Sequence, residues 1–377
     1  MPTGDLVIPA KLKQPELANI LEAIGKDGPD AFYRGDFAHA ITSDIQANCG
    51  ILSMEDLAQY RPFVWDKGLE ISYRGHTVRV PPFASAGITT AMTLKLLDGF
   101  DLASMGHNSE EMLHTYISCA RLAYADRFEY VADPEFADVP WSGMVSDVYT
   151  ARRRGEVTPQ APGAFQAGDP WRDEGRSPER VLASSRPSFD NGTTHLCVVD
   201  GEGNAVSLTN TIMSGFGSGV MPRGTGVIMN NGMMWYDPEP GRVNSIAPGK
   251  FPLNNMTPAL VLDSDGVMLA IGASGGRRIT NCVTQQIVKS LDFGMGPQEG
   301  IDSPRVDCSM PFTSVDPRLD PDLISALERR GHSINILDGG HLRSGFAGFA
   351  SPMVIRRDAA GLTAGVDTFH SAYAEGV

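Results

Sequence analysis

Residues 193–211 read TTHLCVVDGEGNAVSLTNT, and this stretch decides the fold of the chain. Both halves are rich in β-branched and apolar residues, which favour strands. Between them lies Asp200-Gly201-Glu202-Gly203-Asn204, a cluster of residues typical of a hairpin turn. The stretch therefore predicts two antiparallel strands joined by a short loop.

The turn also fixes which residues of the two strands lie opposite each other. With Asp200 opposite Asn204, three further pairs follow: Val198 with Val206, Leu196 with Leu208, and Thr193 with Thr211. The Cβ atoms of directly opposed residues lie about 5 Å apart. The hairpin therefore brings two threonine hydroxyls together at its open end.

A threonine hydroxyl becomes a useful nucleophile only beside a base. The threonine's own α-amine can be that base, once the preceding peptide bond is cut. The segment from Arg152 to Gly192 favours such a cut, because it is rich in Pro, Gly, Ser and charge and has no apolar period. The pattern alone leaves two interpretations: a plain surface hairpin after a loop, or a nucleophile at Thr193 released by cleavage.

The hairpin resembles the start of the small subunit of the γ-glutamyltranspeptidase family, which belongs to the N-terminal-nucleophile hydrolases. The resemblance begins with Thr193-Thr194-His195 and the Val-Val-Asp and Gly-Asn-Ala-Val-Ser runs that follow, and it covers nearly the whole chain in the family's order. The other matching motifs are Gly28-Pro29-Asp30-Ala31-Phe32-Tyr33, Tyr73-Arg74-Gly75, Gly106-His107-Asn108-Ser109, Ala125-Asp126-Arg127, Phe216-Gly217-Ser218-Gly219, Asn230-Asn231, Pro252-Leu253-x-x-Met256-x-Pro258 and Gly272-x-Ser274-Gly275-Gly276.

The resemblance implies an α+β fold, the αββα four-layer sandwich of the N-terminal-nucleophile hydrolases. Residues 1–192 would be the C-terminal part of the large subunit and residues 193–377 the small subunit. Both would come from one precursor cut between Gly192 and Thr193, and both would share one αββα domain. In the family a further N-terminal segment carries any signal peptide and an arginine that binds the substrate's α-carboxylate, and we expect neither here.

The pattern of elements is compatible with that sandwich, with helices first and then strands with helices between them. Helical spacing and capping residues predict helices at 14–26, 29–48, 53–59, 86–97, 279–291 and 321–330, and one from Asn108, as N-cap, to about Val131. Strands are predicted within 69–80, 226–230, 259–262, 267–271 and 333–366.

Composition limits the possible partners. The formal net charge is −14, with 45 acidic against 31 basic residues, which argues against nucleic acid and anionic membranes. The five cysteines are far apart and show neither metal-ligand nor disulfide spacing. We expect a small-molecule amide as substrate, no metal, no organic cofactor and no membrane span, while the compartment and a homo-oligomer stay open.

The resemblance assigns the reacting groups. Thr193 would be the nucleophile, and Thr211 would match the family's second threonine, which hydrogen-bonds the amine and hydroxyl. Gly275 and Gly276, just before a predicted helix, would form the oxyanion hole with their N–H groups. Arg277 and Arg278 would bind an acidic substrate group or lie in solvent.

The substrate-binding positions depart from the family pattern. Asn254-Asn255 replaces a serine pair, and Trp235 stands where the family has an aspartate that pairs with the substrate's α-amine. Asp237 lies two residues away and would substitute if the loop shifts, and Asn231 is the second residue of the Asn-Asn motif. A tryptophan offers only cation–π or apolar contact to an ammonium group.

These residues predict an autoprocessing threonine amidohydrolase or acyltransferase that cleaves γ-glutamyl amides such as glutathione. An acylase with an oxamate or a glutaryl or cephalosporin amide substrate is the first alternative. A non-catalytic truncated homologue and a binding module that uses the same pocket are the other two.

Overall fold

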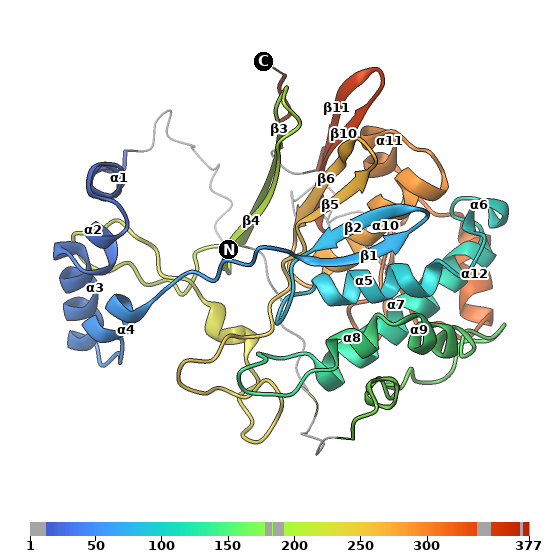
Figure 1. Ribbon diagram of the computed structural model, residues 1–377, viewed down its shortest axis with the longest axis horizontal. Coiled ribbons are helices and arrows are strands. Elements are labelled where there is room, and N and C mark those ends of the chain that lie inside the picture. The colour runs from blue at the N-terminus through green and yellow to red at the C-terminus, as the bar shows by residue number, and fades with distance from the viewer. Residues whose placement is uncertain (1–12, 178–182, 184–191, 338–347, 370–371, 377) are drawn as a thin grey trace, which may run out of the picture. The chain divides into compact units, whose positions relative to one another are not determined.

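The computed structural model describes residues 13–177, 183, 192–337, 348–369 and 372–376. The chain divides into two compact units (Figure 1). Unit 1 comprises residues 1–65 and 216–231, and unit 2 comprises residues 66–215 and 232–377. Unit 2 therefore contains residues from both predicted subunits, and the predicted boundary at residue 193 stays a prediction.

Within its described residues, unit 1 contains four helices: α1 Pro15–Asp27, α2 Asp30–Tyr33, α3 Asp36–Ala47 and α4 Met54–Gln59. The prediction of a single helix over 29–48 was wrong, because the helix breaks at Arg34 and Gly35. A Cβ added at Gly35 would lie 2.7 Å from the Ala31 carbonyl oxygen, so the backbones approach too closely there for another residue. The capping box of Ser53 and Asp56 is present at α4.

The strand predicted at 226–230 was also wrong. The segment has no ladder in the structure, although Met229 makes two backbone hydrogen bonds. Its N–H donates to the Val220 carbonyl at 2.9 Å, and its carbonyl accepts from Ser218 N–H at 2.8 Å. These bonds form a tight loop within unit 1.

Unit 2 is built on a six-stranded antiparallel sheet with the order β1-β2-β5-β6-β10-β11 (Figure 1). Its strands are β1 Leu69–Tyr73, β2 His76–Val80, β5 Ala259–Asp263, β6 Gly266–Ser274, β10 Ser351–Asp358 and β11 Gly361–Val366. Three of its antiparallel pairs are hairpins formed by consecutive strands: β1–β2, β5–β6 and β10–β11. The sequence pattern located the strands of the first two, whereas the third lies within the broad strand region predicted over 333–366.

One face of the sheet packs on helices α5 Gly87–Leu97 and α10 Arg278–Asp292, and α7 Glu110–Tyr130 packs on α5. The buried side chains Leu269, Ile271 and Ala273 of β6 belong to this core. The predicted cap of α7 was wrong by one residue: Asn108 has φ +54°, and Ser109 accepts the capping hydrogen bond from Met112 N–H.

The remaining elements surround this core. They are α6 Leu102–Met105, α8 Trp141–Met144, α9 Asp147–Arg154, the 3₁₀ turns η1 Trp171–Glu174 and η2 Gly232–Trp235, α11 Pro297–Asp302, α12 Pro321–Arg329, and a small sheet of β7 Val306–Asp307, β8 Thr313–Val315 and β9 Ile334–Ile336. Residues 178–182 and 184–191 of the segment in which cleavage is predicted lie outside the described residues.

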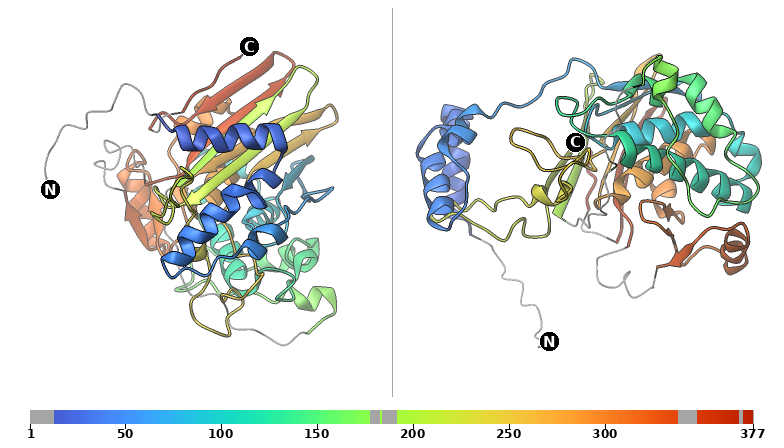
Figure 2. Two further views of the ribbon diagram at one scale, coloured as in Figure 1. Left: turned by 90° about the vertical axis from the view of Figure 1, so that its left-hand side faces the viewer. Right: turned by 90° about the horizontal axis from the view of Figure 1, so that it is seen from below.

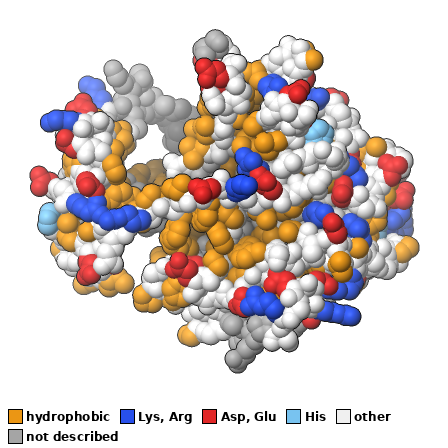
Figure 3. All heavy atoms as spheres, in the orientation of Figure 1, with side chains coloured by type: hydrophobic (Ala, Val, Ile, Leu, Met, Phe, Trp, Pro, Cys, Tyr) orange, Lys and Arg blue, Asp and Glu red, His pale blue; other side chains and the backbone are white. Residues whose placement is uncertain are grey.

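The hairpin of β3 Gly192–Val199 and β4 Ala205–Met213 packs on the opposite face of the sheet from these helices (Figure 2). Its register is as predicted, with Thr193 opposite Thr211. The side chains of His195, Ser207 and Thr209 face the sheet. Leu196, Val198, Val206 and Leu208 face outward and are 42–52% exposed. Hydrophobic side chains are visible along the hairpin in Figure 3. Unit 2 thus stacks helices, a sheet and a hairpin in an α+β fold.

Candidate active site

The open end of the β3–β4 hairpin brings two threonine side chains into contact. Thr193 Oγ1 lies 2.8 Å from Thr211 Oγ1, and both residues are partly buried. This contact follows directly from the register, because opposed side chains of an antiparallel pair point to the same face. The structure therefore brings together the two hydroxyls that the sequence singled out.

Thr211 also contacts the peptide bond before Thr193. Its hydroxyl donates to the Gly192 carbonyl at 3.2 Å and accepts from Met213 N–H at 2.9 Å. The register shifts between Gly192 and Thr193, so the ladder is irregular at this bond. With Thr211 donating to Gly192, the Thr193 hydroxyl is left to donate to Thr211 Oγ1.

Gly192 occupies a position that admits no side chain. A Cβ there would lie 2.0 Å from the Ser214 carbonyl oxygen. The facing strand ends at Met213, which is fully buried and has φ +76°, an unusual conformation for a residue with a side chain. The two strands thus end in a tightly packed backbone junction around the 192–193 bond.

His195 lies two residues along β3 from Thr193, and the sequence reasoning did not single it out as a site residue. Its Nδ1 is 2.9 Å from Thr209 Oγ1 and its Nε2 is 3.2 Å from Cys197 Sγ. A Cβ added at Gly272 of β6 would lie 1.9 Å from the imidazole Cε1, so the ring fills the space above that glycine. Burial lowers the pKa of His195 to about 4, and the imidazole is neutral at pH 7.

The predicted oxyanion glycines lie where β6 turns into α10. Gly275 has φ +131° and Gly276 has φ +63°. A Cβ on Gly275 would lie 2.6 Å from Ala350 Cα, so only glycine fits that position. The 15-residue helix α10 begins directly after the turn and places its positive end there.

The β3–β4 hairpin and the turn at Gly275 and Gly276 belong to neighbouring layers of unit 2. His195 packs on Gly272, three residues before Gly275, and Thr193 lies two residues from His195. At about 3.3 Å per residue, Thr193 and the Gly275 turn each lie within about 10 Å of that contact. Both predicted parts of the catalytic machinery are therefore held by one packed interface.

The two arginines after the glycines have different surroundings. Arg278 Nε donates to the Gly275 carbonyl at 3.2 Å and its Nη1 donates to the Gly348 carbonyl at 3.0 Å, so Arg278 braces the turn. The guanidinium of Arg277 lies over the Phe128 ring, with 4.8 Å between Cζ and the ring centroid.

The predicted asparagine pair is tied to a buried arginine. Arg127 is 1% exposed, and its Nη2 donates to the Asn254 carbonyl at 2.7 Å and to Asn255 Oδ1 at 3.2 Å. Asn254 uses its own Oδ1 to accept from Met256 N–H. Asn255 is 3% exposed, and its Nδ2 has no hydrogen-bond partner among the described residues. Their predicted role in substrate binding stays a prediction.

The other predicted substrate residues are spread over two units. Asn231 belongs to unit 1, whereas Trp235 and Asp237 belong to unit 2. The Trp235 carbonyl accepts from Asn244 Nδ2 at 2.7 Å. Asp237 is 1% exposed, and its Oδ1 accepts from Glu239 N–H at 3.0 Å within the same loop. In the described conformation, Asp237 therefore supports its own loop.

Within the described ranges, no group of three or more His, Cys, Asp or Glu side chains is placed to hold a metal ion. Within the same ranges, no helix is long and apolar enough to cross a membrane.

Comparison with known proteins identifies the family. The sequence profile described as Gamma-glutamyltranspeptidase matches residues 3–377. The chain belongs to this family. It is 33% identical over 347 residues to the glutathione hydrolase proenzyme of Bacillus subtilis subsp. natto, covering 90% of this chain and 58% of that protein. It is 34% identical over 336 residues to the acylase ACY 1 proenzyme of Pseudomonas sp. (strain SE83), covering 89% of this chain and 57% of that protein.

Solved structures show the fold. The crystal structure of cephalosporin acylase from Bacillus halodurans matches with a TM-score of 0.83 and 29% identity, covering 97% of this chain and 63% of that one. The predicted α+β fold of the N-terminal-nucleophile hydrolases is therefore confirmed. The chain spans more than half, but less than two thirds, of the length of these three proteins.

Proposed function

We propose that this chain is an autoprocessing threonine amidohydrolase or acyltransferase with Thr193 as its nucleophile. The observation that carries the proposal is the 2.8 Å contact between Thr193 Oγ1 and Thr211 Oγ1, combined with the bond from Thr211 to the Gly192 carbonyl. Both relatives compared above are named proenzymes, which supports processing of one precursor into a large and a small subunit.

Apart from water, processing needs only groups that lie beside the 192–193 bond. The Thr193 hydroxyl oxygen attacks the Gly192 carbonyl carbon, while the Thr211 hydroxyl polarises that carbonyl by hydrogen bonding. A C–O bond forms, the C–N bond breaks, and the hydroxyl proton ends on the new α-amine. Water then hydrolyses the ester, which leaves a carboxylate on Gly192 and a free amine on Thr193.

The freed amine is the base for turnover. An α-amine has a reference pKa of about 8, so about a tenth of it is unprotonated at pH 7. It accepts the proton of the Thr193 hydroxyl as that oxygen attacks the amide carbonyl of the substrate. The N–H groups of Gly275 and Gly276 stabilise the oxyanion, the amine product leaves, and water or a second amine resolves the Thr193 ester.

The substrate class has two candidates. A γ-glutamyl amide such as glutathione is supported by the named activity of the Bacillus relative. An acylase-type amide is supported by the relative at 34% identity, by the TM-score of 0.83 to a cephalosporin acylase, and by Trp235 in place of the family's aspartate. A tryptophan cannot supply the charge that an α-ammonium group needs.

Intact mass measurement and N-terminal sequencing test the processing step. We expect the purified chain to become two polypeptides, with a new N-terminus at Thr193 and a total mass increased by one water. The Thr193→Ala variant should stay one polypeptide. If the wild-type chain keeps its 192–193 bond indefinitely, the proposal is wrong.

A substrate screen on the processed protein separates the two candidates. Matched p-nitroanilides of γ-glutamate, glutarate and oxamate differ in the α-ammonium group and chain length. Preference for the γ-glutamyl compound supports the glutathione-type reaction, whereas preference for glutaryl or oxamyl compounds supports the acylase type. Processing without turnover of any of the three would refute the substrate assignment but not the nucleophile.

A further inference from the structure

The turn between β6 and α10 contains two glycines in succession, and these residues alone do not fix the peptide that joins them. Gly275 has φ +131° and Gly276 has φ +63°. Because glycine adopts positive and negative φ about equally well, this peptide can turn over by a rotation of ψ at Gly275 and φ at Gly276. Its orientation therefore has to be set by a contact from outside the glycine pair.

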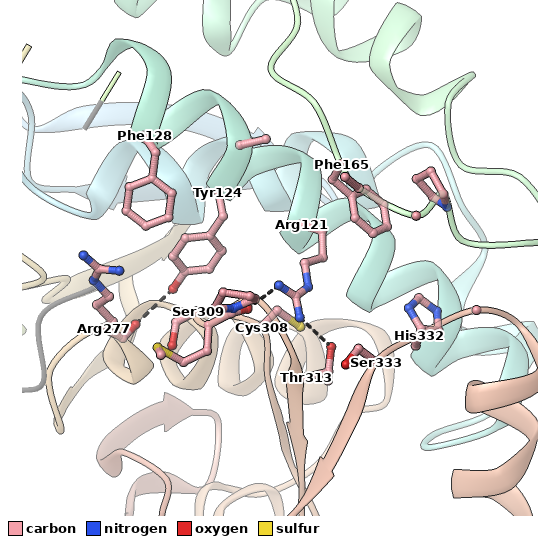
Figure 4. A pocket seen from close by; sticks show the side chains of 17 residues that line it. Arg121, Tyr124, Phe128, Phe165, Arg277, Cys308, Ser309, Thr313, His332 and Ser333 are labelled. Atoms are coloured by element: carbon pink, nitrogen blue, oxygen red, sulfur yellow. Dashed lines mark hydrogen bonds between the residues drawn. The ribbon is translucent and has the colours of Figure 1, made fainter. Parts of the chain in front are cut away.

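The two peptides that follow have hydrogen-bond donors of their own. The Gly276 carbonyl accepts from Ile279 N–H at 3.1 Å, where α10 begins. The Arg277 carbonyl accepts from the Tyr124 hydroxyl of α7 at 3.0 Å, a contact that Figure 4 shows. The peptide between Gly275 and Gly276 lies one step before these two, so neither bond fixes it.

Arg278 holds the carbonyl of that remaining peptide. Its Nε donates to the Gly275 carbonyl at 3.2 Å, and its Nη1 donates to the Gly348 carbonyl at 3.0 Å. The backbone after Gly348 also packs on the turn, since a Cβ added to Gly275 would lie 2.6 Å from Ala350 Cα. One planar guanidinium thus joins the Gly275 carbonyl to a neighbouring piece of backbone, and its rigid fork restricts the orientation of that carbonyl.

This contact decides the direction of the Gly276 N–H. In a planar trans peptide the C=O and the N–H point in opposite directions, and the described residues contain no cis peptide bond. The guanidinium that binds the Gly275 carbonyl therefore directs the Gly276 N–H away from itself. If the peptide turned over, a carbonyl oxygen would take the place of that N–H, and it would repel an oxyanion instead of stabilising it.

The start of a helix is otherwise an unfavourable place for an arginine. Arg278 is the first residue of α10 and Arg277 is its N-cap, and the first turn holds no acidic residue. A helix N-terminus carries partial positive charge, so a cation there is repelled. Burial raises the pKa of Asp307, and the hydrogen bond from Ser309 and the charge of Arg278 oppose that rise, so Asp307 offsets part of the repulsion. Arg278 is therefore favoured by its neighbours in the fold and not by the helix that it begins.

We propose that Arg278 is a positioning residue, which holds the peptide between Gly275 and Gly276 in the orientation that directs the Gly276 N–H to the oxyanion. It acts through the turn and is not itself a catalytic group. The inference rests on the proposed function, because it needs the two glycine N–H groups to be the oxyanion hole.

Steady-state kinetics of processed Arg278→Met test this role with the p-nitroanilide of γ-glutamate, glutarate or oxamate that wild type cleaves fastest. Loss of one oxyanion donor typically lowers kcat by about 10²- to 10³-fold, and a peptide that keeps the right orientation for part of the time loses less. We expect kcat to fall by about 10- to 100-fold with KM within about threefold of wild type, because the oxyanion forms only as the reaction proceeds. A rise in KM at unchanged kcat would show that Arg278 binds substrate, and would overturn the proposal.

Chemical rescue separates positioning from a general effect on packing. Arg278→Ala removes the whole side chain and leaves space for a guanidinium ion, which offers the same planar donors. We expect millimolar guanidinium chloride to raise the kcat of Arg278→Ala at least about fivefold, and sodium chloride at the same ionic strength to leave it unchanged. Arg79→Ala is the matched control, because Arg79 forms an exposed pair with Glu70 on strands β1 and β2. Its kcat should stay within about twofold of wild type and should not respond to guanidinium.

A crystal structure of Arg278→Met gives a readout that needs neither turnover nor processing. We expect the peptide between Gly275 and Gly276 to be turned over or to occupy two orientations. A single orientation identical to that of wild type would overturn the proposal, even if none of the three p-nitroanilides is cleaved. An unchanged kcat in Arg278→Met, or no rescue by guanidinium, would overturn it as well. Thermal unfolding of each variant verifies that the fold is retained.

The Thr193→Ala variant distinguishes failure of this inference from failure of the proposed function. If Thr193→Ala cleaves the substrate as wild type does, the proposed function is wrong. If Thr193→Ala is inactive whereas Arg278→Met keeps the wild-type kcat, the nucleophile stands and the inference about Arg278 is wrong.

Discussion

Replacing Thr211 by valine removes one hydroxyl while it keeps the side-chain shape. That hydroxyl makes three contacts: 2.8 Å to Thr193 Oγ1, 3.2 Å to the Gly192 carbonyl and 2.9 Å to Met213 N–H. Removing a single donor to a developing oxyanion typically slows acyl chemistry by about 10²-fold, or roughly 3 kcal/mol. We therefore expect Thr211→Val to cleave the 192–193 bond about 10² times more slowly than wild type.

Thr211→Val should also lower the stability of the fold. The Met213 N–H loses its acceptor in a fully buried residue, and this costs roughly 1–3 kcal/mol of unfolding free energy. Thr211→Ser is the matched control, since it keeps the hydroxyl and all three contacts. We expect the serine variant to process within about threefold of wild type.

The assay follows the appearance of the two-chain form by denaturing gel and intact mass, at a temperature well below the unfolding midpoint of every variant. If Thr211→Val processes as fast as wild type while Thr193→Ala does not process, the Thr211 hydroxyl has no part in cleavage. If valine and serine slow cleavage equally, the effect comes from packing and the hydrogen-bonding argument is wrong.

Four further predictions concern Gly192, Gly272, Arg127 and His195. Gly192→Ala should block processing, since its Cβ would lie 2.0 Å from the Ser214 carbonyl oxygen; normal two-chain formation on a gel would contradict this. Gly272→Ala should cost roughly 1–3 kcal/mol in a denaturant titration, because the new methyl group overlaps the His195 ring at 1.9 Å. Arg127→Met should raise KM for the best screened substrate more than it lowers kcat, because Asn254 and Asn255 lose the arginine that fixes them; unchanged kinetics would show that the pair does not bind substrate. The pKa of His195 is lowered to about 4 in the folded state, so the contribution of neutral His195 to stability is present above pH 6.5 and is lost as the pH falls from 6.5 to 4. The loss is up to about 3 kcal/mol of unfolding free energy. His195→Gln should flatten that part of the pH–stability curve.

Features that depend on residues close together in the sequence were predicted correctly in two places. The turn residues 200–204 set the register that brings Thr193 opposite Thr211, and Ser53 with Asp56 marked the start of α4. The cap at Ser109 was missed by one residue, because Asn108 offered equally good capping chemistry. The break at Gly35 was missed altogether, because it depends on a close approach to the Ala31 carbonyl that the apolar spacing does not show.

Non-local packing could not be read from the pattern. Nothing in the sequence around His195 indicates that its ring lies on Gly272, which is far away along the chain. Arg127 and Asn255 are likewise joined only by the fold, so that an expected substrate residue is buried beside an arginine. Alternation alone also gave no reason to place His195, Ser207 and Thr209 on the inner face of the hairpin and its four exposed aliphatic side chains on the outer face.

The outward face of the hairpin has a practical consequence for handling the protein. Four aliphatic side chains stand on a two-stranded ribbon, and in the described part of the chain the outer edge of each strand lacks a ladder partner. Such a ribbon is a template for stacking against another molecule. Light scattering of concentrated samples should therefore rise steeply with concentration. Val206→Lys should reduce this rise without disturbing the buried side of the strand.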